Sequence, residues 1–290
     1  MKLYKYTINP VSPFATPVKG DTLFGSICWA IVYLYGEDKL KEFLKDYDEN
    51  PFLIVSDGFL KNHLIKPTFP RALLGELEDG KKKEYRKKIW VEVSDILRGD
   101  FSKAKKESEV EFRKNLFEVK NSINYKTFTT GEGFAPFLVD SVIYLKEVDI
   151  YMLIRDDVVI DEVKRAFKLL SKLGYGKDAN LGKGKFEIGD FKEVNVKESE
   201  YYMALSDFVK SEVDGKVYYD VVTKFPKTRG DLPNPFKNPL LMAKVGAGIK
   251  LSKKDKLQYV GKAIRGFSND SKIVHQGYAI TFPIGVENEN

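Results

Sequence analysis

The sequence predicts an α+β protein whose first domain has the split βαβ order of a ferredoxin-like fold. In residues 1–198, strand-like and amphipathic helix-like segments follow one another as strand, helix, strand, insertion, strand, helix, strand. Residues 199–290 hold further strand-like runs, which predict a smaller, strand-rich second domain. Hydrophobic residues make up 43% of the chain, enough for a sizeable core.

The first half of this order is read from residues 2–60. Apolar alternation in residues 2–8 predicts a strand, and a loop with three prolines follows it. Asp21 then stands where a helix N-cap is expected, before an apolar stripe that predicts a helix over residues 22–35. Gly36 ends this helix, and residues 52–60 predict the second strand.

The second half follows the insertion. Residues 139–146 and 148–155 predict two strands paired with each other. A second helix starts at Asp161 and carries an apolar stripe up to Gly174, a glycine typical of a helix C-terminus. Residues 185–191 predict the last strand of this domain.

Residues 61–136 interrupt this rhythm with prolines, glycines and many charges, so they are predicted to form a long insertion. Within it, residues 81–114 contain 12 Lys and Arg against 7 Asp and Glu, a local excess of +5 in a chain of net charge +6. This excess indicates either a polyanionic partner or a solvated insertion, and charge alone does not separate the two. The strand-like runs of the second domain are 201–209, 217–225, 240–251 and 277–283.

The strongest local signal is residues 174–186, with four Gly and three Lys at a helix-to-strand junction. Glycines allow backbone N–H groups to approach an anion, and lysines neutralise phosphates. A P-loop is excluded because its order is strand, loop, helix. The competing interpretation is a flexible turn with solubilising lysines. The candidate RNA contacts here are Lys172, Gly176, Lys177, Asn180, Gly182, Lys183, Gly184 and Lys185.

A second signal is the polar and aromatic stretch 121–133. Hydroxyl and amide side chains suit phosphate, 2′-OH and base-edge hydrogen bonds, and aromatic rings suit base stacking. A strand with an exposed polar face is the competing interpretation. The candidates are Asn121, Ser122, Asn124, Tyr125 and Thr127.

A third signal is the start of the first helix, where Lys19 and Thr22 stand at a terminus that favours anions. Catalysis finds little support, because neither His63 nor His275 is accompanied by a nucleophile or carboxylate motif. A hydrogen-bonding role is favoured for His275.

Several classes of protein are disfavoured. One cysteine, Cys28, and two histidines do not make a zinc site, so no metal and no cofactor are expected. The N-terminus lacks the features of a secretory signal. The longest apolar run, residues 27–35, is far shorter than the ~20 residues that span a bilayer. A cytoplasmic protein without a membrane partner is expected.

Together these segments resemble the RAMP proteins of CRISPR systems, in which a Gly-rich loop follows the second helix of a ferredoxin-like domain. The resemblance narrows to the Csm4 family, in the Cas5 group of RAMP subunits, from type III-A (Csm) effector complexes. It runs from about residue 1 to 286 and is carried by residues 21–25, 66–70, 121–130, 240–246 and 275–280.

The resemblance implies two ferredoxin-like (RRM-like) domains and a projecting thumb formed by the insertion. It implies that the chain binds the five-prime tag of the CRISPR RNA (crRNA) without catalysis, and it adds His275 to the RNA-binding candidates. The implied protein partners are the large polymerase/cyclase-like subunit and the backbone RAMP subunits. In many relatives an Arg stands at the position of Tyr125, so a guanidinium contact is not expected here, and base stacking by Tyr125 is the alternative.

Two other functions stay open at this point. One is a metal-independent endoribonuclease that processes precursor crRNA, since such enzymes share the double ferredoxin-like fold and a Gly-rich loop. In those enzymes, however, the loop lies near the C-terminus, whereas over 100 residues follow it here. The other is a protein-interaction subunit whose basic charge is incidental.

Overall fold

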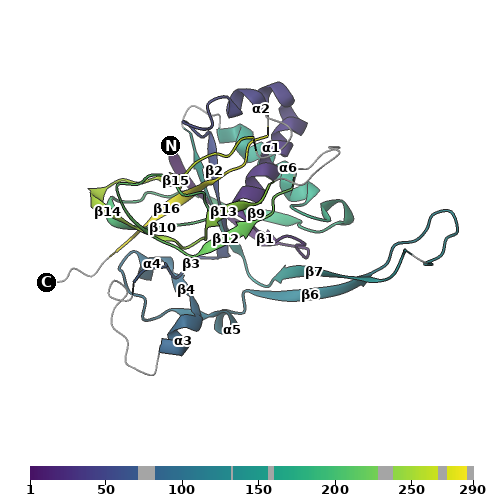
Figure 1. Cartoon of the computed structure of the whole chain (residues 1–290), viewed down its shortest axis with the longest axis horizontal. Coiled ribbons are helices and arrows are strands. Elements are labelled where there is room, and N and C mark those ends of the chain that lie inside the picture. The colour runs from purple at the N-terminus through teal and green to yellow at the C-terminus, as the bar shows by residue number, and fades with distance from the viewer. Residues whose placement is uncertain (71–81, 132, 156–159, 228–237, 267–272, 286–290) are drawn as a thin grey trace.

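Figure 1 shows the protein as a computed structural model with two larger sheets, helices, and an insertion that ends in a long hairpin. The structure describes residues 1–290 except 71–81, 132, 156–159, 228–237, 267–272 and 286–290. Lys81, the first residue of the predicted basic stretch, lies outside the described residues.

The first sheet has the predicted ferredoxin-like order. Its strands are β1 (Lys2–Pro10), β2 (Leu53–Leu60), β8 (Val148–Ile154) and β9 (Phe186–Glu193), hydrogen-bonded in the order β2-β8-β1-β9. All three strand pairs are antiparallel. Helices α1 (Gly20–Tyr35) and α6 (Ile160–Leu173) pack against each other, and α2 (Glu37–Leu44) packs on α1. Tyr6 of β1 meets Phe167 of α6 with ring centroids 4.8 Å apart, which places both helices over one face of the sheet.

The predicted cap of α1 is wrong. The helix begins at Gly20, one residue before Asp21, and the Lys19 side chain makes no cap hydrogen bond. The Gly20 N–H instead donates to Asp57 Oδ1 at 2.9 Å, so a residue of β2 satisfies this orphan donor. The predicted ends of both helices are confirmed, because Gly36 and Gly174 have φ of 86° and 92° and donate to Val32 and Leu170 carbonyls.

The insertion is a folded subdomain followed by a hairpin. It contains the sheet β3 (His63–Ile65), β4 (Lys88–Glu92) and β5 (Lys105–Lys106), with α3 (Lys82–Lys87), α4 (Val93–Ile96) and α5 (Glu107–Val110). Trp90 and Phe112 are buried in it, with ring centroids 5.1 Å apart. About half of its basic side chains are matched from within. Six cations of this stretch pair with acids of the same stretch: Lys87, Arg98, Lys103, Lys105, Lys106 and Arg113.

The hairpin corrects a predicted strand pairing. β7 (Phe137–Tyr144) pairs along its whole length with β6 (Arg113–Lys120) and not with β8. β8 turns away into the first sheet, between β1 and β2. In Figure 1 the β6–β7 hairpin extends far beyond the body of the molecule, and the insertion therefore runs to residue 144 rather than 136.

The C-terminal region forms a second antiparallel sheet. Five of its strands, β10 (Ser199–Ala204), β11 (Gly215–Tyr218), β14 (Gly248–Asp255), β15 (Tyr259–Gly261) and β16 (Tyr278–Ile284), are ordered β11-β14-β10-β16-β15. β12 (Val221–Lys224) and β13 (Leu240–Ala243) form a separate ribbon. The predicted runs 217–225 and 240–251 are thus each broken into two strands. The described part of residues 199–285 contains no helix, so it does not show the ferredoxin-like pattern expected of the second domain.

The two sheets share one hydrophobic core. Tyr151 of β8 meets Phe282 of β16 with ring centroids 5.9 Å apart. Met203 and Ile280 of the second sheet belong to the same buried cluster as the first sheet and its helices. Within the described part of the chain, no helix is long and apolar enough to cross a membrane.

Candidate nucleic-acid interface

The Gly-rich loop is a compact turn rather than an open cradle. After α6 it forms one 3-10 turn, Ala179–Leu181, and then enters β9. Gly176, Gly182 and Gly184 all have positive φ, between 71° and 87°, a conformation that favours glycine. A Cβ on Gly184 would lie 2.1 Å from the Tyr175 carbonyl oxygen, so close backbone packing requires this glycine.

At two positions of the loop, the glycine N–H groups are not available to donate the predicted hydrogen bonds to an anion. The Gly182 N–H donates to Ala179 O at 3.0 Å, and the Gly184 N–H donates to Pro13 O at 2.8 Å. These donors are satisfied within the protein. Gly176 packs against Thr16, whose hydroxyl accepts a hydrogen bond from the Lys177 N–H at 3.1 Å. The glycines therefore serve the fold of the loop.

Lys183 is buried, which contradicts its predicted contact with phosphate. Its side chain is only 8% exposed, and Nζ pairs with Glu118 of β6 and donates to Ser141 Oγ of β7 at 2.5 Å. A second ion pair joins Lys120 of β6 to Asp178 of the loop at 3.3 Å. The loop thus holds the root of the hairpin.

Three lysines of the loop region remain available to an anion. Lys172, Lys177 and Lys185 are exposed, and Asn180 is exposed beside them. We call these four side chains the loop surface. It keeps the cations that a phosphate backbone requires, on a turn whose own backbone is fixed.

The polar and aromatic stretch lies at the outer end of the hairpin, between the end of β6 at Lys120 and the start of β7 at Phe137. Asn121, Ser122, Tyr125 and Thr127 are exposed. Asn124 closes the turn, since its N–H donates to Thr129 O at 3.0 Å and its side chain accepts from the Lys126 N–H. We call residues 121–130 the hairpin tip.

The hairpin also carries exposed apolar side chains that were not predicted as contacts. Phe128 at the tip is 83% exposed, and Tyr125 is 76% exposed. On the strands, Val119 lies opposite Leu138 with both side chains exposed, and Phe117 lies on the same face. The alternation of apolar residues in 116–120 was a visible signal of a strand. Only the structure shows that no other part of the described chain covers the apolar face of this strand.

Lys19 belongs to a buried charge cluster instead of an open helix terminus. Its Nζ lies 2.6 Å from Asp57 Oδ2 and 3.2 Å from Asp207 Oδ2. Burial alone would lower the pKa of Lys19, but the two carboxylates outweigh it and raise the pKa above its ordinary value. Burial raises the pKa of Asp57 to about 6, with Asp207 adding to the effect and Lys19 opposing it.

His275 is part of the same cluster, which corrects its prediction as an RNA contact. It is 5% exposed, and its Nε2 lies 3.4 Å from Asp21 Oδ2. Asp21 also pairs with Lys224 of β12 at 2.5 Å and accepts the Thr22 N–H at 2.7 Å. Burial would raise the pKa of Asp21, but Lys224 and His275 outweigh it and lower the pKa.

The cluster connects the start of α1 with the second sheet and its ribbon. Asp207 Oδ1 accepts the Val245 N–H at 2.8 Å, and Gln276 exchanges two hydrogen bonds of 2.8 Å with the Val55 backbone. Among the described residues, no group of three or more His, Cys, Asp or Glu side chains is arranged to hold a metal ion. The cluster's role is structural, and Thr22, the other residue predicted at the helix start, is partly exposed.

Comparisons with known proteins agree with this architecture. The RAMP superfamily model matches residues 16–187, more than half of the chain. The chain belongs to the RAMP superfamily. The resemblance drawn from the sequence is therefore confirmed at this level. A search of curated protein sequences finds no match.

Solved structures with a similar fold come from CRISPR complexes. A chain of a Csm3–Csm4 subcomplex from a type III-A interference complex has a TM-score of 0.62 at 16% identity, covering 98% of this chain and 100% of its own. Chains of the Csm1–Csm4 cassette bound to cA4 and to pppApA have TM-scores of 0.61 and 0.57 at 18% and 19% identity, each covering 100% of both chains. At these identities the comparison shows that this chain has the same fold as those chains over almost its whole length.

The charge cluster gives a test of the fold that depends on pH. In Lys19→Met, Asp57 loses its cation in a buried site, which raises the pKa of Asp57 further above its value of about 6. We expect a loss of roughly 2–4 kcal/mol in the free energy of unfolding at pH 7.5. The loss should shrink at pH 5, because the folded variant then takes up a proton that the unfolded chain does not yet bind. Urea unfolding at both pH values measures it.

Lys192→Met is the matched control, since the Lys192–Asp190 pair lies on the surface with both side chains more than half exposed. Its effect should stay within about 0.5 kcal/mol at either pH. An equal loss for both variants, or one for Lys19→Met that does not change with pH, would contradict the role of the cluster.

Proposed function

We propose that this chain is a Csm4-type, non-catalytic subunit of a type III-A CRISPR effector complex. It binds the sugar-phosphate backbone of the crRNA and caps the five-prime tag of that RNA. It links the large polymerase/cyclase-like subunit to the backbone RAMP subunits. The solved structures with the same fold support this, since they are complexes of Csm4 with Csm1 and of Csm4 with Csm3.

The observation that carries the RNA-binding part is the loop surface beside a projecting hairpin. Lys172, Lys177 and Lys185 present exposed charge on a rigid turn, and Lys183 fixes that turn to the root of the hairpin. Exposed rings at the hairpin tip suit stacking on splayed bases. Phosphate contacts position a strand without reading sequence, as a common guide-holding subunit requires.

The absence of catalysis is part of the proposal. His275 is buried against Asp21, so it is not placed to move a proton on bound RNA. The Nδ1 of His63, the other histidine, lies 2.9 Å from the Lys61 carbonyl oxygen, so the backbone engages this ring nitrogen.

The first test removes the charge of the loop surface. Lys172→Ala/Lys177→Ala/Lys185→Ala should weaken RNA retention by the reconstituted complex about equally for different sequences. It should also reduce the salt dependence of log K by about 2, because each phosphate contact on a single strand contributes ~0.7. Filter binding over a range of salt concentrations measures both.

A triple variant elsewhere controls for net charge. Lys216→Ala/Lys253→Ala/Lys254→Ala removes three exposed lysines of β11 and β14, which lie at the end of the molecule opposite the hairpin in Figure 1. RNA retention should be nearly unchanged. An equal weakening by the two triple variants would mean that only overall charge matters, and the loop assignment would fail.

The second test addresses the hairpin tip. Tyr125→Ala/Phe128→Ala should lower RNA affinity by about 1–3 kcal/mol for each base that stacks. Both rings are exposed, so the thermal midpoint should not move. Tyr33→Ala/Phe225→Ala, which removes one exposed Tyr and one exposed Phe elsewhere, should leave RNA affinity unchanged. Unaltered affinity in the tip variant would exclude stacking there.

The third test separates this proposal from a ribonuclease. A repeat-containing RNA incubated with the purified chain in a chelator should stay uncut over hours. Specific cleavage that His63→Ala abolishes, with RNA binding retained, would establish the alternative, a metal-independent endoribonuclease that processes precursor crRNA.

A further inference from the structure

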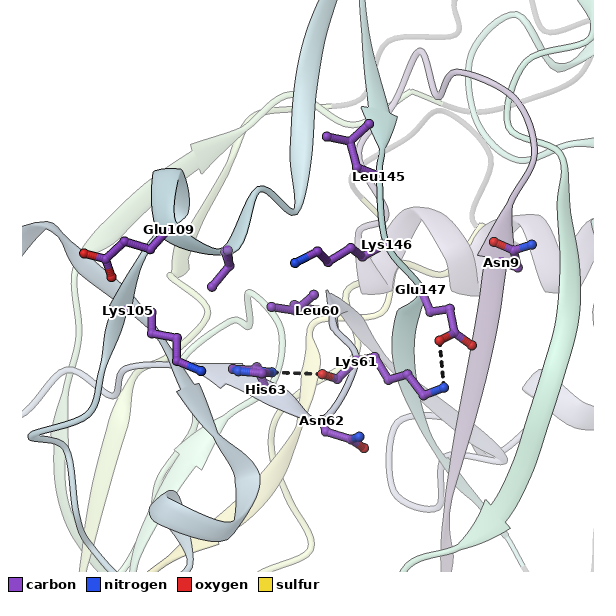
Figure 2. Close-up of a pocket in the computed structure, with 11 residues that line it drawn as sticks. Asn9, Leu60, Lys61, Asn62, His63, Lys105, Glu109, Leu145, Lys146 and Glu147 are labelled. Atoms are coloured by element: carbon purple, nitrogen blue, oxygen red, sulfur yellow. Dashed lines mark hydrogen bonds and ion pairs between the residues drawn. The ribbon is translucent and has the colours of Figure 1, made fainter.

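A surface hollow of about 620 Å³ lies at the root of the hairpin, between the insertion and the first sheet (Figure 2). Leu145 and Lys146, which directly follow β7, form part of its wall. Leu60 ends β2 at one edge of the first sheet, whereas the Gly-rich loop leads into β9 at the other edge. Asn9 of β1 also lines the hollow and pairs with Glu187 of β9, but no residue of the loop surface belongs to the lining.

The floor of the hollow is aliphatic. Leu60 and Val110 are buried, and Leu145 is 45% exposed beside them. Small-ligand sites of about 300–1000 Å³ commonly combine such a floor with a few polar groups that fix orientation. A flat heterocyclic base would bury its ring face here.

The cation that enters the hollow is Lys146. No carboxylate of the described residues pairs with it, and Figure 2 shows its side chain extending over Leu60. The two acids of the lining do not cancel it. Glu147 pairs with Lys61 at 2.7 Å, and the carboxylate of Glu109 lies at the outer side of the hollow. The net field inside favours an anion.

Further polar groups complete the wall. Lys105 is held only by a surface pair with Glu92 at 3.1 Å, an interaction worth little, so its Nζ can turn to a phosphate. Asn62 Oδ1 accepts from Lys5 at 3.0 Å, which leaves the Asn62 amide hydrogens as donors. Asn9 adds a second, exposed amide. Amides of this kind pair with base edges.

We infer that this hollow binds one nucleotide, with its base on Leu60, Val110 and Leu145 and its phosphate at Lys146. This rests on the proposed function, because in the assembled complex the nucleotide would belong to the RNA strand that the loop surface holds. The protein would then contact RNA bases in the hollow as well as at the hairpin tip.

The test titrates the full chain with adenosine 5′-monophosphate and, separately, with inorganic phosphate, using calorimetry or ligand-observed NMR. The nucleotide should bind more tightly than phosphate. Lys146→Ala should weaken both ligands about tenfold, the loss of one charge-assisted contact. Leu145→Ala should weaken the nucleotide about threefold and leave phosphate unchanged, because only apolar area is removed.

Lys192→Ala, which removes an exposed lysine of β9 outside the hollow, should change neither affinity. Equal affinity for the nucleotide and phosphate would reduce the site to an anion site and overturn the inference. So would binding of a glutamate-rich peptide in place of the nucleotide, which would indicate a protein partner. Loss of binding in Lys192→Ala would do the same.

RNA retention by the reconstituted complex separates the two proposals. If the loop-surface triple variant weakens retention and Lys146→Ala does not, only the nucleotide hollow fails. If neither variant weakens it, RNA binding by this chain fails as a whole. If both variants weaken RNA retention, the result supports one RNA strand that reaches the loop surface and the hollow.

Discussion

The buried ammonium group of Lys183 fixes how the Gly-rich loop meets the rest of the molecule. A charge removed from water must be compensated, and Glu118 and Ser141 supply that compensation from the two strands of the hairpin. Moving the loop away from the hairpin would leave a buried charge unpaired. The loop and the hairpin root are therefore one rigid unit, and the exposed lysines on that loop have defined positions.

Local sequence patterns were sufficient for the elements of the first sheet. Apolar periodicity and helix ends are local, so residues 2–8, 22–35 and 52–60 were placed nearly as observed. Strand partners are not local. Only three residues separate β7 from β8, which made a hairpin between them the natural expectation, but the chain turns there from one sheet to another. Likewise, Gly246 with φ of 86° interrupts the apolar run that looked like one strand over 240–251.

The sequence singled out the Gly-rich loop and the hairpin as candidate RNA-binding segments, but several residues predicted as contacts serve the fold instead. Lys177, Lys183 and Lys185 are lysines of one short segment, and nothing in the local sequence distinguishes them. Of these three, only Lys183 pairs with an acidic residue, Glu118, which lies 65 residues away in the chain and keeps the lysine buried. Asp21 satisfies the local rule for an N-cap, yet Asp57 provides the hydrogen bond to the helix. His275 is 254 residues away from Asp21 in the chain and still reaches it in the core. In each case a distant residue decides burial, and burial decides whether a polar side chain serves the fold or a ligand.

Other lysines of the described structure divide in the same way between those that stabilise the fold and those proposed to bind RNA. Lys19 and Lys224, which both have buried carboxylate partners, hold the second sheet and its ribbon against the start of α1. The lysines proposed to contact RNA have no such partners, and they stand on the loop surface and in the hollow. The hairpin touches both, because Glu118 and Ser141 anchor the loop while Leu145 and Lys146 continue from β7 into the hollow. A strand of RNA that occupied both places would pass the root of the hairpin, and its path would be set by the same ion pair that fixes the loop.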